Sequence, residues 1–197
     1  MAMTSQNAQT TPEQLADYGR LLHTLLVELP DHPAITDTLD YVLGALYGLA
    51  QAHHIGFKDR STQYVPVYRP HLANYALEVS TGQALDSVWT AGFYFNSGIQ
   101  RLASAFDRLP RMLGAKMKKS MNGKMRPTTA KERMTEKNPN GFSKWEKVYD
   151  EVNAFKHSPE GRAAGRTVTM NDALSVVAEM MQLISSEKAT LAKRYAP

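Results

Sequence analysis

Residues 85–109 read LDSVWTAGFYFNSGIQRLASAFDRL, and this stretch decides the fold class. Its apolar positions recur in alternating steps of three and four residues. The positions in this rhythm are Leu85, Val88, Gly92, Phe95, Ile99, Leu102, Phe106 and Leu109. The rhythm predicts a long central α-helix with one apolar stripe, and its period near 3.5 favours shallow-angle packing in a bundle. Gly92 would let a neighbouring backbone approach, and Pro110 should end or kink the helix.

Two helical patterns precede this stretch. The segment Thr11-Pro12-Glu13-Gln14 is typical of a helix start. It combines a hydroxyl cap, a proline at a position where the backbone need not donate a hydrogen bond, and a glutamine three residues after the cap. Apolar residues then recur at helical spacing as far as Pro30, and again between Pro33 and Gly56. Since the turn between them is short, we expect these two helices to pack as an antiparallel pair.

Two further helices follow the central one. One begins near Ser143, ends at Ser158-Pro159, and has a core face of Trp145, Val148, Val152 and Phe155. Thr169 and Asp172 form a plausible capping pair for a last helix that reaches Leu191. A short helix is also expected over residues 71–79. The patterns together predict an all-α, up-down bundle of four main helices plus a short helix.

The composition bounds the class of protein. A chain of 197 residues with 43% hydrophobic and 21% charged residues suits one globular domain. We expect a disordered N-terminus over residues 1–10 and a single helical domain over 11–197. The polar N-terminus and the lack of a long apolar run predict a protein that is neither exported nor membrane-spanning. The absence of cysteine excludes thiol chemistry and fits the cytoplasm.

The net charge of +4 is concentrated in one segment. Residues 111–137 hold nine basic and two acidic residues, a balance of 9 − 2 = +7, which leaves 4 − 7 = −3 for the rest of the chain. Because Asn122-Gly123, Pro127 and residues 138–141 interrupt regular structure, we expect a mobile basic insertion over 111–141. Met117, Met121 and Met125, at steps of four, leave an amphipathic basic helix as the alternative.

The basic insertion is the candidate nucleic-acid interface, since lysine and arginine neutralise phosphates and release counterions. An anionic surface or an acidic protein is the alternative ligand, and a solubilising loop is the alternative role. The candidate contacts are Lys116, Lys118, Lys119, Lys124, Arg126, Lys131 and Arg133.

A second candidate site lies on the helix that begins near Ser143. Glu146, Asp150, Asn153 and His157 follow one another at spacings of four, three and four residues, which places them on one stripe. An imidazole titrates near neutrality and can transfer protons there. The alternative is a solvated face on which His157 interacts with the carbonyl end of the helix dipole.

The run VYDEVNAFKH at residues 148–157 resembles the signature helix of the HEPN superfamily, the higher-eukaryote and prokaryote nucleotide-binding helical domains. In that family an arginine, often followed by asparagine, precedes a histidine by a few residues. Residues 92–102 and 107–109 are similar to the preceding long helix of some prokaryotic members. Asn153 and His157 match the motif, whereas Val152 stands where the family has its arginine.

The resemblance implies an RNA-associated, homodimeric protein of a prokaryotic defence or toxin–antitoxin type. Active members of the family are metal-independent endoribonucleases in which the histidine handles protons and the arginine steadies the phosphate. By that likeness His157 would transfer protons, Asn153 would orient it or contact phosphate, and Glu146 and Asp150 would support them. Valine cannot neutralise a phosphorane, and losing one such contact costs about 10²–10³ in rate.

Two hypotheses about function therefore remain open. The first is a HEPN-like protein with weakened or absent ribonuclease activity, in which Lys156, Arg162, Arg166 or Arg101 would have to replace the missing arginine. The second is a non-catalytic helical module that binds nucleic acid or a protein, such as the product of a neighbouring gene, through its basic loop. The period of the central helix and Gly92 also predict a symmetric homodimer. No residue spacing suggests a metal ion or a cofactor.

Overall fold

The computed structural model describes residues 11–57, 87–114, 117–128, 132, 136, 142–157 and 167–196. These residues form six α-helices and one antiparallel two-stranded hairpin, which confirms the predicted all-α class. The elements are α1 (Thr11–Glu28), α2 (Pro33–His54), α4 (Ser87–Leu113), β1 (Met117–Lys119), β2 (Met125–Pro127), α6 (Phe142–His157), α8 (Met170–Ser186) and α9 (Lys188–Arg194). The short helix predicted at 71–79 and the N-terminus over 1–10 lie outside the described residues.

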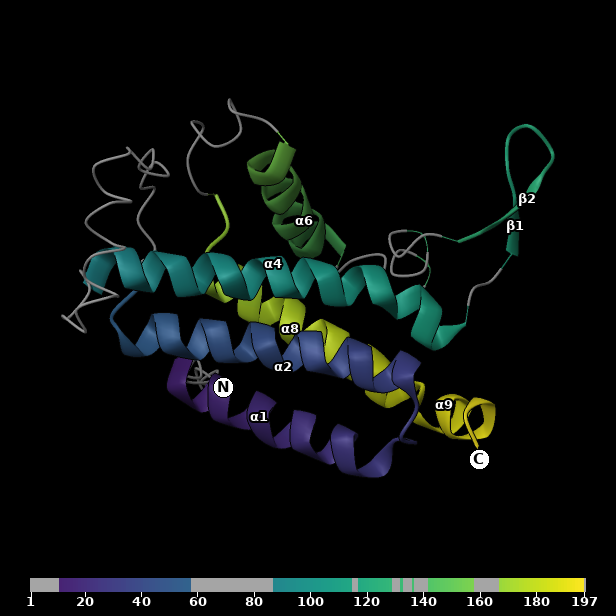
Figure 1. The fold of residues 1–197 in the computed structure, drawn as a ribbon, viewed down its shortest axis with the longest axis horizontal. Helices are drawn as coiled ribbons and strands as arrows, with labels where there is room; N and C mark the ends of the chain where they lie inside the picture. Colours follow the sequence, from purple (N-terminus) through teal and green to yellow (C-terminus); the bar gives the residue numbers. More distant parts are fainter. Residues whose placement is uncertain are drawn as a thin grey trace, which may run out of the picture.

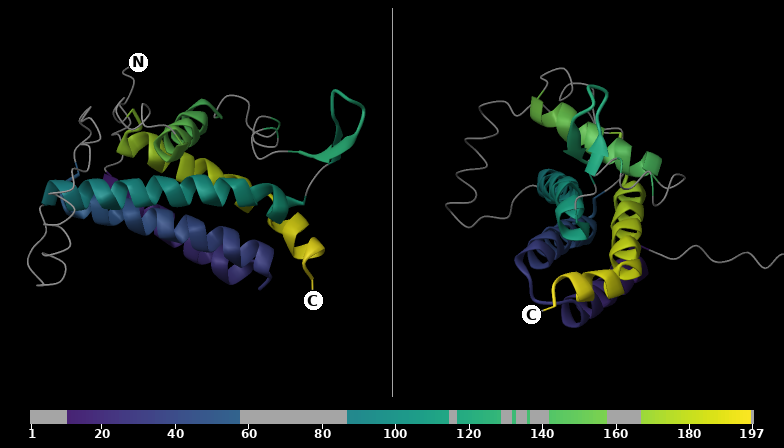
Figure 2. Two further views of the ribbon diagram at one scale, coloured as in Figure 1. Left: turned by 45° about the horizontal axis from the view of Figure 1, so that its top comes forward. Right: turned by 90° about the vertical axis from the view of Figure 1, so that its right-hand side faces the viewer.

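Four helices, α1, α2, α4 and α8, run alongside one another, and α6 lies obliquely across α4 and α8 (Figures 1 and 2). The hairpin of β1 and β2 follows the end of α4 and projects away from the bundle (Figure 1). Helix α6 is the helix predicted to begin near Ser143. No helix among the described residues is long and apolar enough to cross a membrane.

The apolar stripe of α4 forms the centre of the core. Phe95, Ile99, Leu102, Phe106 and Leu109 are each at most 2% exposed. They belong to one cluster with buried side chains of the other four long helices, and α4 packs most extensively against α2. Because this stripe is buried within one chain, its period does not by itself argue for the predicted homodimer.

Helix α4 continues through Pro110 and ends three residues later, so of the two predicted effects, an end or a kink, the end is wrong. A proline at this position cannot donate the amide hydrogen bond to the carbonyl four residues earlier. The burial of Met112 and Leu113 nevertheless holds the last turn in place. The hydroxyl of Tyr195 also donates to the backbone carbonyls of Arg111 and Met112, at 3.2 and 2.9 Å. Packing and this side-chain cap together stabilise the turn.

The predicted start of the last helix is confirmed. α1 is helical from Thr11, the first residue that the structure describes. At α8 the Thr169 hydroxyl accepts from the Asp172 amide and the Asp172 carboxylate accepts from the Thr169 amide, each at 3.1 Å, which is a capping box. The last helix is not continuous, since α8 ends at Ser186 and Leu191 is buried in the separate helix α9.

Residues 117–127 form a β-hairpin, so the alternative of an amphipathic basic helix is wrong for this part of the insertion. Lys118 pairs with Arg126, and Lys119 pairs with Met125. Gly123 closes the turn with a φ of +80°, a conformation that glycine adopts without steric cost. Asn-Gly is the strongest short-range hairpin signal, and here its turn chemistry prevails over the helical spacing of the methionines.

Candidate functional site

Helix α6 carries the predicted polar stripe. Its backbone is helical as far as His157, so Glu146, Asp150, Asn153 and His157 start from the same side of the helix. Asp150 is exposed, whereas Glu146 and Asn153 are half-buried. The side chain of His157 lies outside the described residues. The structure therefore aligns the four positions along one stripe, and it describes three of the four side chains.

Val152, which stands at the motif arginine position, is a core residue. Its side chain is 2% exposed, and Val148 and Trp145 on the same face of α6 are 0% and 2% exposed. The Trp145 ring stacks on Phe106 of α4, with the ring centroids 3.2 Å apart. The position from which the family's arginine would reach a phosphate thus points into the apolar core. An arginine there would carry an unpaired charge into that core.

Arg101, one of the residues proposed as a substitute cation, packs over α2. A Cβ atom added to Gly44 of α2 would lie 2.7 Å from the Arg101 Cδ atom. Phe106, through which α4 contacts Trp145 of α6, is five residues further along α4 and hence on a different side of the helix. Arg101 therefore faces away from the polar stripe. Arg162, Arg166 and the Lys156 side chain lie outside the described residues.

Glu151 is a buried carboxylate that lies outside the predicted polar stripe. Its side chain is 9% exposed, and its Oε2 atom accepts hydrogen bonds from the Thr167 amide (2.7 Å), the Thr167 hydroxyl (2.9 Å) and the Val168 amide (2.7 Å). These bonds fix the chain just before the capping box of α8. In the sequence, the position of Glu151 between the core residues Val148 and Val152 indicates a buried carboxylate. Such a carboxylate requires hydrogen-bond partners.

The hairpin gathers four of the seven predicted nucleic-acid contacts. These are Lys118, Lys119, Lys124 and Arg126. Lys116, Lys131 and Arg133 lie outside the described residues. Because side chains alternate along a strand, Lys118 and Arg126 share one face of the hairpin, and Met117, Lys119 and Met125 share the other.

One face of the hairpin carries an ion-pair cluster. Both terminal nitrogens of Arg126 donate to Glu132, at 2.9 and 2.6 Å, and Lys118 Nζ lies 3.3 Å from the same carboxylate. The hydrogen bond to Glu132 and the charge of this carboxylate raise the pKa of the Arg126 guanidinium above its usual value. This face is partly neutralised, whereas Lys119 lies on the opposite face.

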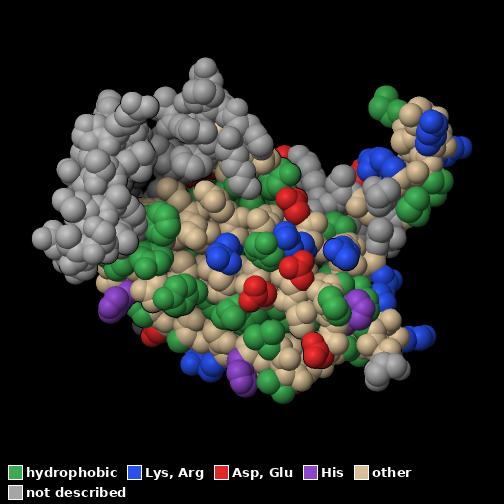
Figure 3. All heavy atoms as spheres, viewed as in Figure 1, with side chains coloured by type: hydrophobic (Ala, Val, Ile, Leu, Met, Phe, Trp, Pro, Cys, Tyr) green, Lys and Arg blue, Asp and Glu red, His purple; other side chains and the backbone are tan. Residues whose placement is uncertain are grey.

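Three methionine side chains of the hairpin are exposed. Met117, Met121 and Met125 are 55%, 109% and 60% exposed, and Met121 sits at the tip. The projecting hairpin shows hydrophobic and basic side chains side by side (Figure 3). Such a surface combines charge with flexible apolar contacts, which is typical of a binding element.

The chain matches no protein-family model, no curated protein and no solved structure. The resemblance to the HEPN superfamily therefore stays a prediction that rests on residues 83–109 and 143–157. Among the described residues, no group of three or more acidic or histidine side chains is placed to hold a metal ion.

Proposed function

We propose that this protein is a non-catalytic helical module that binds single-stranded RNA through the hairpin of β1 and β2. The observation that carries the proposal is the placement of Lys118, Lys119, Lys124 and Arg126 on one element that projects from the bundle (Figures 1 and 3). The bundle acts as the scaffold that holds this element away from the rest of the surface.

The charge of the hairpin supports a phosphate-bearing ligand. Residues 117–128 contain four basic residues and no acidic one, and Glu132 is ion-paired with two of the four, which leaves 4 − 1 = +3. Contacts from lysine and arginine to phosphates release condensed counterions. Three such contacts on a single strand give a slope of about −2 for the logarithm of the binding constant against the logarithm of salt concentration.

The methionines favour a single strand over a duplex. Met117 and Met125 flank Lys119 on one face of the hairpin, where they can contact splayed bases while the lysine contacts the backbone. The major groove of duplex RNA is too deep and narrow for side chains to read, so proteins mostly contact bases where they are unstacked. We therefore expect weak sequence preference and a clear preference for unpaired RNA.

The burial of Val152 and the orientation of Arg101 support a protein without catalysis, because neither position supplies a cation beside Asn153. A metal-independent endoribonuclease remains the second candidate, and the alignment of Asn153 and His157 on α6 favours it. An RNA cleavage assay without added metal distinguishes the two candidate functions. RNA incubated with the protein without metal should stay intact, and cleavage that disappears in His157→Ala would contradict the proposal.

RNA binding is tested by fluorescence anisotropy with a labelled unstructured RNA and its duplex form. Lys119→Glu should weaken binding about tenfold, which corresponds to about 1.4 kcal/mol. Arg20→Glu is the matched control, since it makes the same charge change on α1, where Arg20 is 72% exposed and paired only with the nearby Asp17 in the structure described. Equal weakening by the two variants would show that net charge, and not the hairpin, governs binding.

A further inference from the structure

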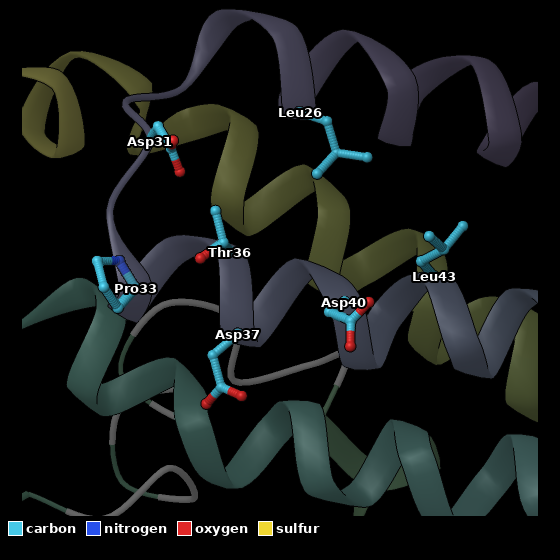
Figure 4. A pocket seen from close by; sticks show the side chains of 7 residues that line it. All are labelled: Leu26, Asp31, Pro33, Thr36, Asp37, Asp40 and Leu43. Carbon is cyan, nitrogen blue, oxygen red and sulfur yellow. The ribbon is translucent and has the colours of Figure 1, made fainter.

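A hollow between α1 and α2 is a second exposed surface of the molecule, besides the hairpin. It has a volume of about 510 Å³ and lies beside the turn that joins the two helices. Leu26 reaches into it from α1 and Leu43 from α2 (Figure 4), and these side chains are 43% and 46% exposed. Tyr47, one turn beyond Leu43, is 59% exposed. We call this surface the α1–α2 hollow.

The α1–α2 hollow has an acidic rim. Asp31 in the turn and Asp40 on α2 line it and are exposed. Asp37 also lines it but accepts a hydrogen bond of 2.8 Å from Arg108 Nε, so its charge is compensated within the chain. The hollow therefore offers the apolar side chains of Leu26 and Leu43 together with the carboxylates of Asp31 and Asp40.

The hairpin carries the complementary pattern. Met121 at its tip is fully exposed, and Lys119 and Lys124 stand on either side of it. A methionine side chain fits an irregular apolar surface because it is unbranched and flexible. The two lysines would then face the carboxylates of Asp31 and Asp40. Apolar contact and charge complementarity act together in this arrangement.

A chain cannot place its own hairpin in its own hollow in the described arrangement. The hairpin projects on one side of the bundle and α1 lies on the opposite side, with α4 and α2 between them (Figures 1 and 2). We infer that the hairpin of one chain docks in the α1–α2 hollow of a second copy. This inference does not require the protein to bind RNA.

Two different surfaces of the same chain meet in this contact. Two chains that exchange hairpins reciprocally form a closed dimer with two-fold symmetry, and otherwise the contact is heterologous and repeats into rings or open chains. The interface is small and charged, so the association is weak and decreases with salt. If RNA binds the same hairpin, RNA and the hollow compete for it, and added RNA should dissociate the assembly.

A charge-exchange experiment tests the inference. The first variant reverses the hairpin charges (Lys119→Glu with Lys124→Glu), and the second reverses the rim of the hollow (Asp31→Lys with Asp40→Lys). Each variant alone should associate about tenfold more weakly than the wild type, because like charges now face each other. An equimolar mixture of the two variants should recover association, since each hairpin again meets a rim of opposite charge.

Sedimentation velocity over a range of protein concentrations at low and high salt gives the readout. A wild-type chain that stays monomeric at high micromolar concentration and low salt would overturn the inference, and so would a mixture that does not recover association. Circular dichroism of both variants shows that they are folded. The second variant keeps its hairpin, so its RNA binding tests the proposed function separately from self-association.

Discussion

Gly48 of α2 and Gly98 of α4 meet backbone to backbone. A Cβ atom added to Gly48 would lie 2.9 Å from the Cα and N atoms of Gly98 and 2.9 Å from the carbonyl oxygen of Tyr94. Because backbone atoms cannot yield as a flexible side chain can, a methyl group there must push the two helices apart. The most extensive helix pair of the bundle thus depends on these two glycines.

We expect Gly48→Ala to lower the free energy of unfolding by about 1–3 kcal/mol through overpacking. Gly19→Ala is the control, since a Cβ atom at this position of α1 meets nothing within 4 Å. It should raise stability by up to about 1 kcal/mol through helix propensity. Urea unfolding followed by circular dichroism measures both, and equal stabilities for the two variants would contradict the close approach.

Removal of the Glu151 carboxylate should be costly. Glu151→Ala leaves the Thr167 and Val168 amides without their acceptor, and each unsatisfied amide costs about 1–3 kcal/mol. Asp150→Ala removes an exposed carboxylate from the next position, and the expected change is within about 0.5 kcal/mol. Thermal unfolding of the two variants makes the comparison, and RNA affinity should be the same for both.

An arginine introduced at position 152 should destabilise the protein and not create a nuclease. Val152→Arg places a charge among Val148 and Trp145, which costs at least about 3 kcal/mol. Asn153→Arg, on the half-buried stripe, should cost about 1 kcal/mol or less. A folded Val152→Arg protein of unchanged stability that cleaves RNA would restore the ribonuclease hypothesis.

The Asp172 side chain should stabilise the fold in a pH-dependent way. Burial raises the pKa of this carboxyl group, but hydrogen bonds from Lys147 and Thr169 outweigh burial and lower it below 3.8. A lowered pKa in the folded state means that the stabilisation is complete above pH 3.8 and is lost as the pH falls further. The stability difference between the wild type and Asp172→Asn should therefore be constant near neutrality and shrink in acid.

Glu179 should show the opposite dependence. Burial raises its pKa, an effect that Lys144 partly offsets, and its Oε2 atom is buried and accepts no hydrogen bond from the described residues. Because the folded state holds the proton more tightly, this group costs stability as the pH rises above 4.5. Glu179→Gln should raise the melting temperature more at pH 7 than in acid, and an equal gain at both pH values would contradict this assignment.

The helices were predictable because their signals are local and periodic. The stripe of α4 and the capping residues Thr169 and Asp172 are read directly from the sequence, and both lie where they were expected. The passage of α4 through Pro110 was not predictable in this way. It depends on the burial of Met112 and on the Tyr195 hydroxyl, which are contacts between distant parts of the chain.

The candidate sites were predictable only in part. The residues of the basic insertion were identified, but the helical spacing of its methionines concealed the hairpin, although Asn122-Gly123 is a hairpin turn signal. On α6, Val152 was assigned both to the core face and to the motif position, and the packing shows that it lies in the core. The α1–α2 hollow depends on how two helices meet, which no single stretch of sequence encodes.

The hydrogen bonds of Glu151 make two loop amides suitable probes of local opening by hydrogen exchange. The amides of Thr167 and Val168 lie outside any helix, yet both donate to a carboxylate on α6. Their exchange with deuterium should be slow while α6 is docked and fast when it detaches, since protection measures the free energy of each local opening. Exchange at these two positions would thus reveal whether a ligand that binds the distant hairpin changes how firmly α6 is held.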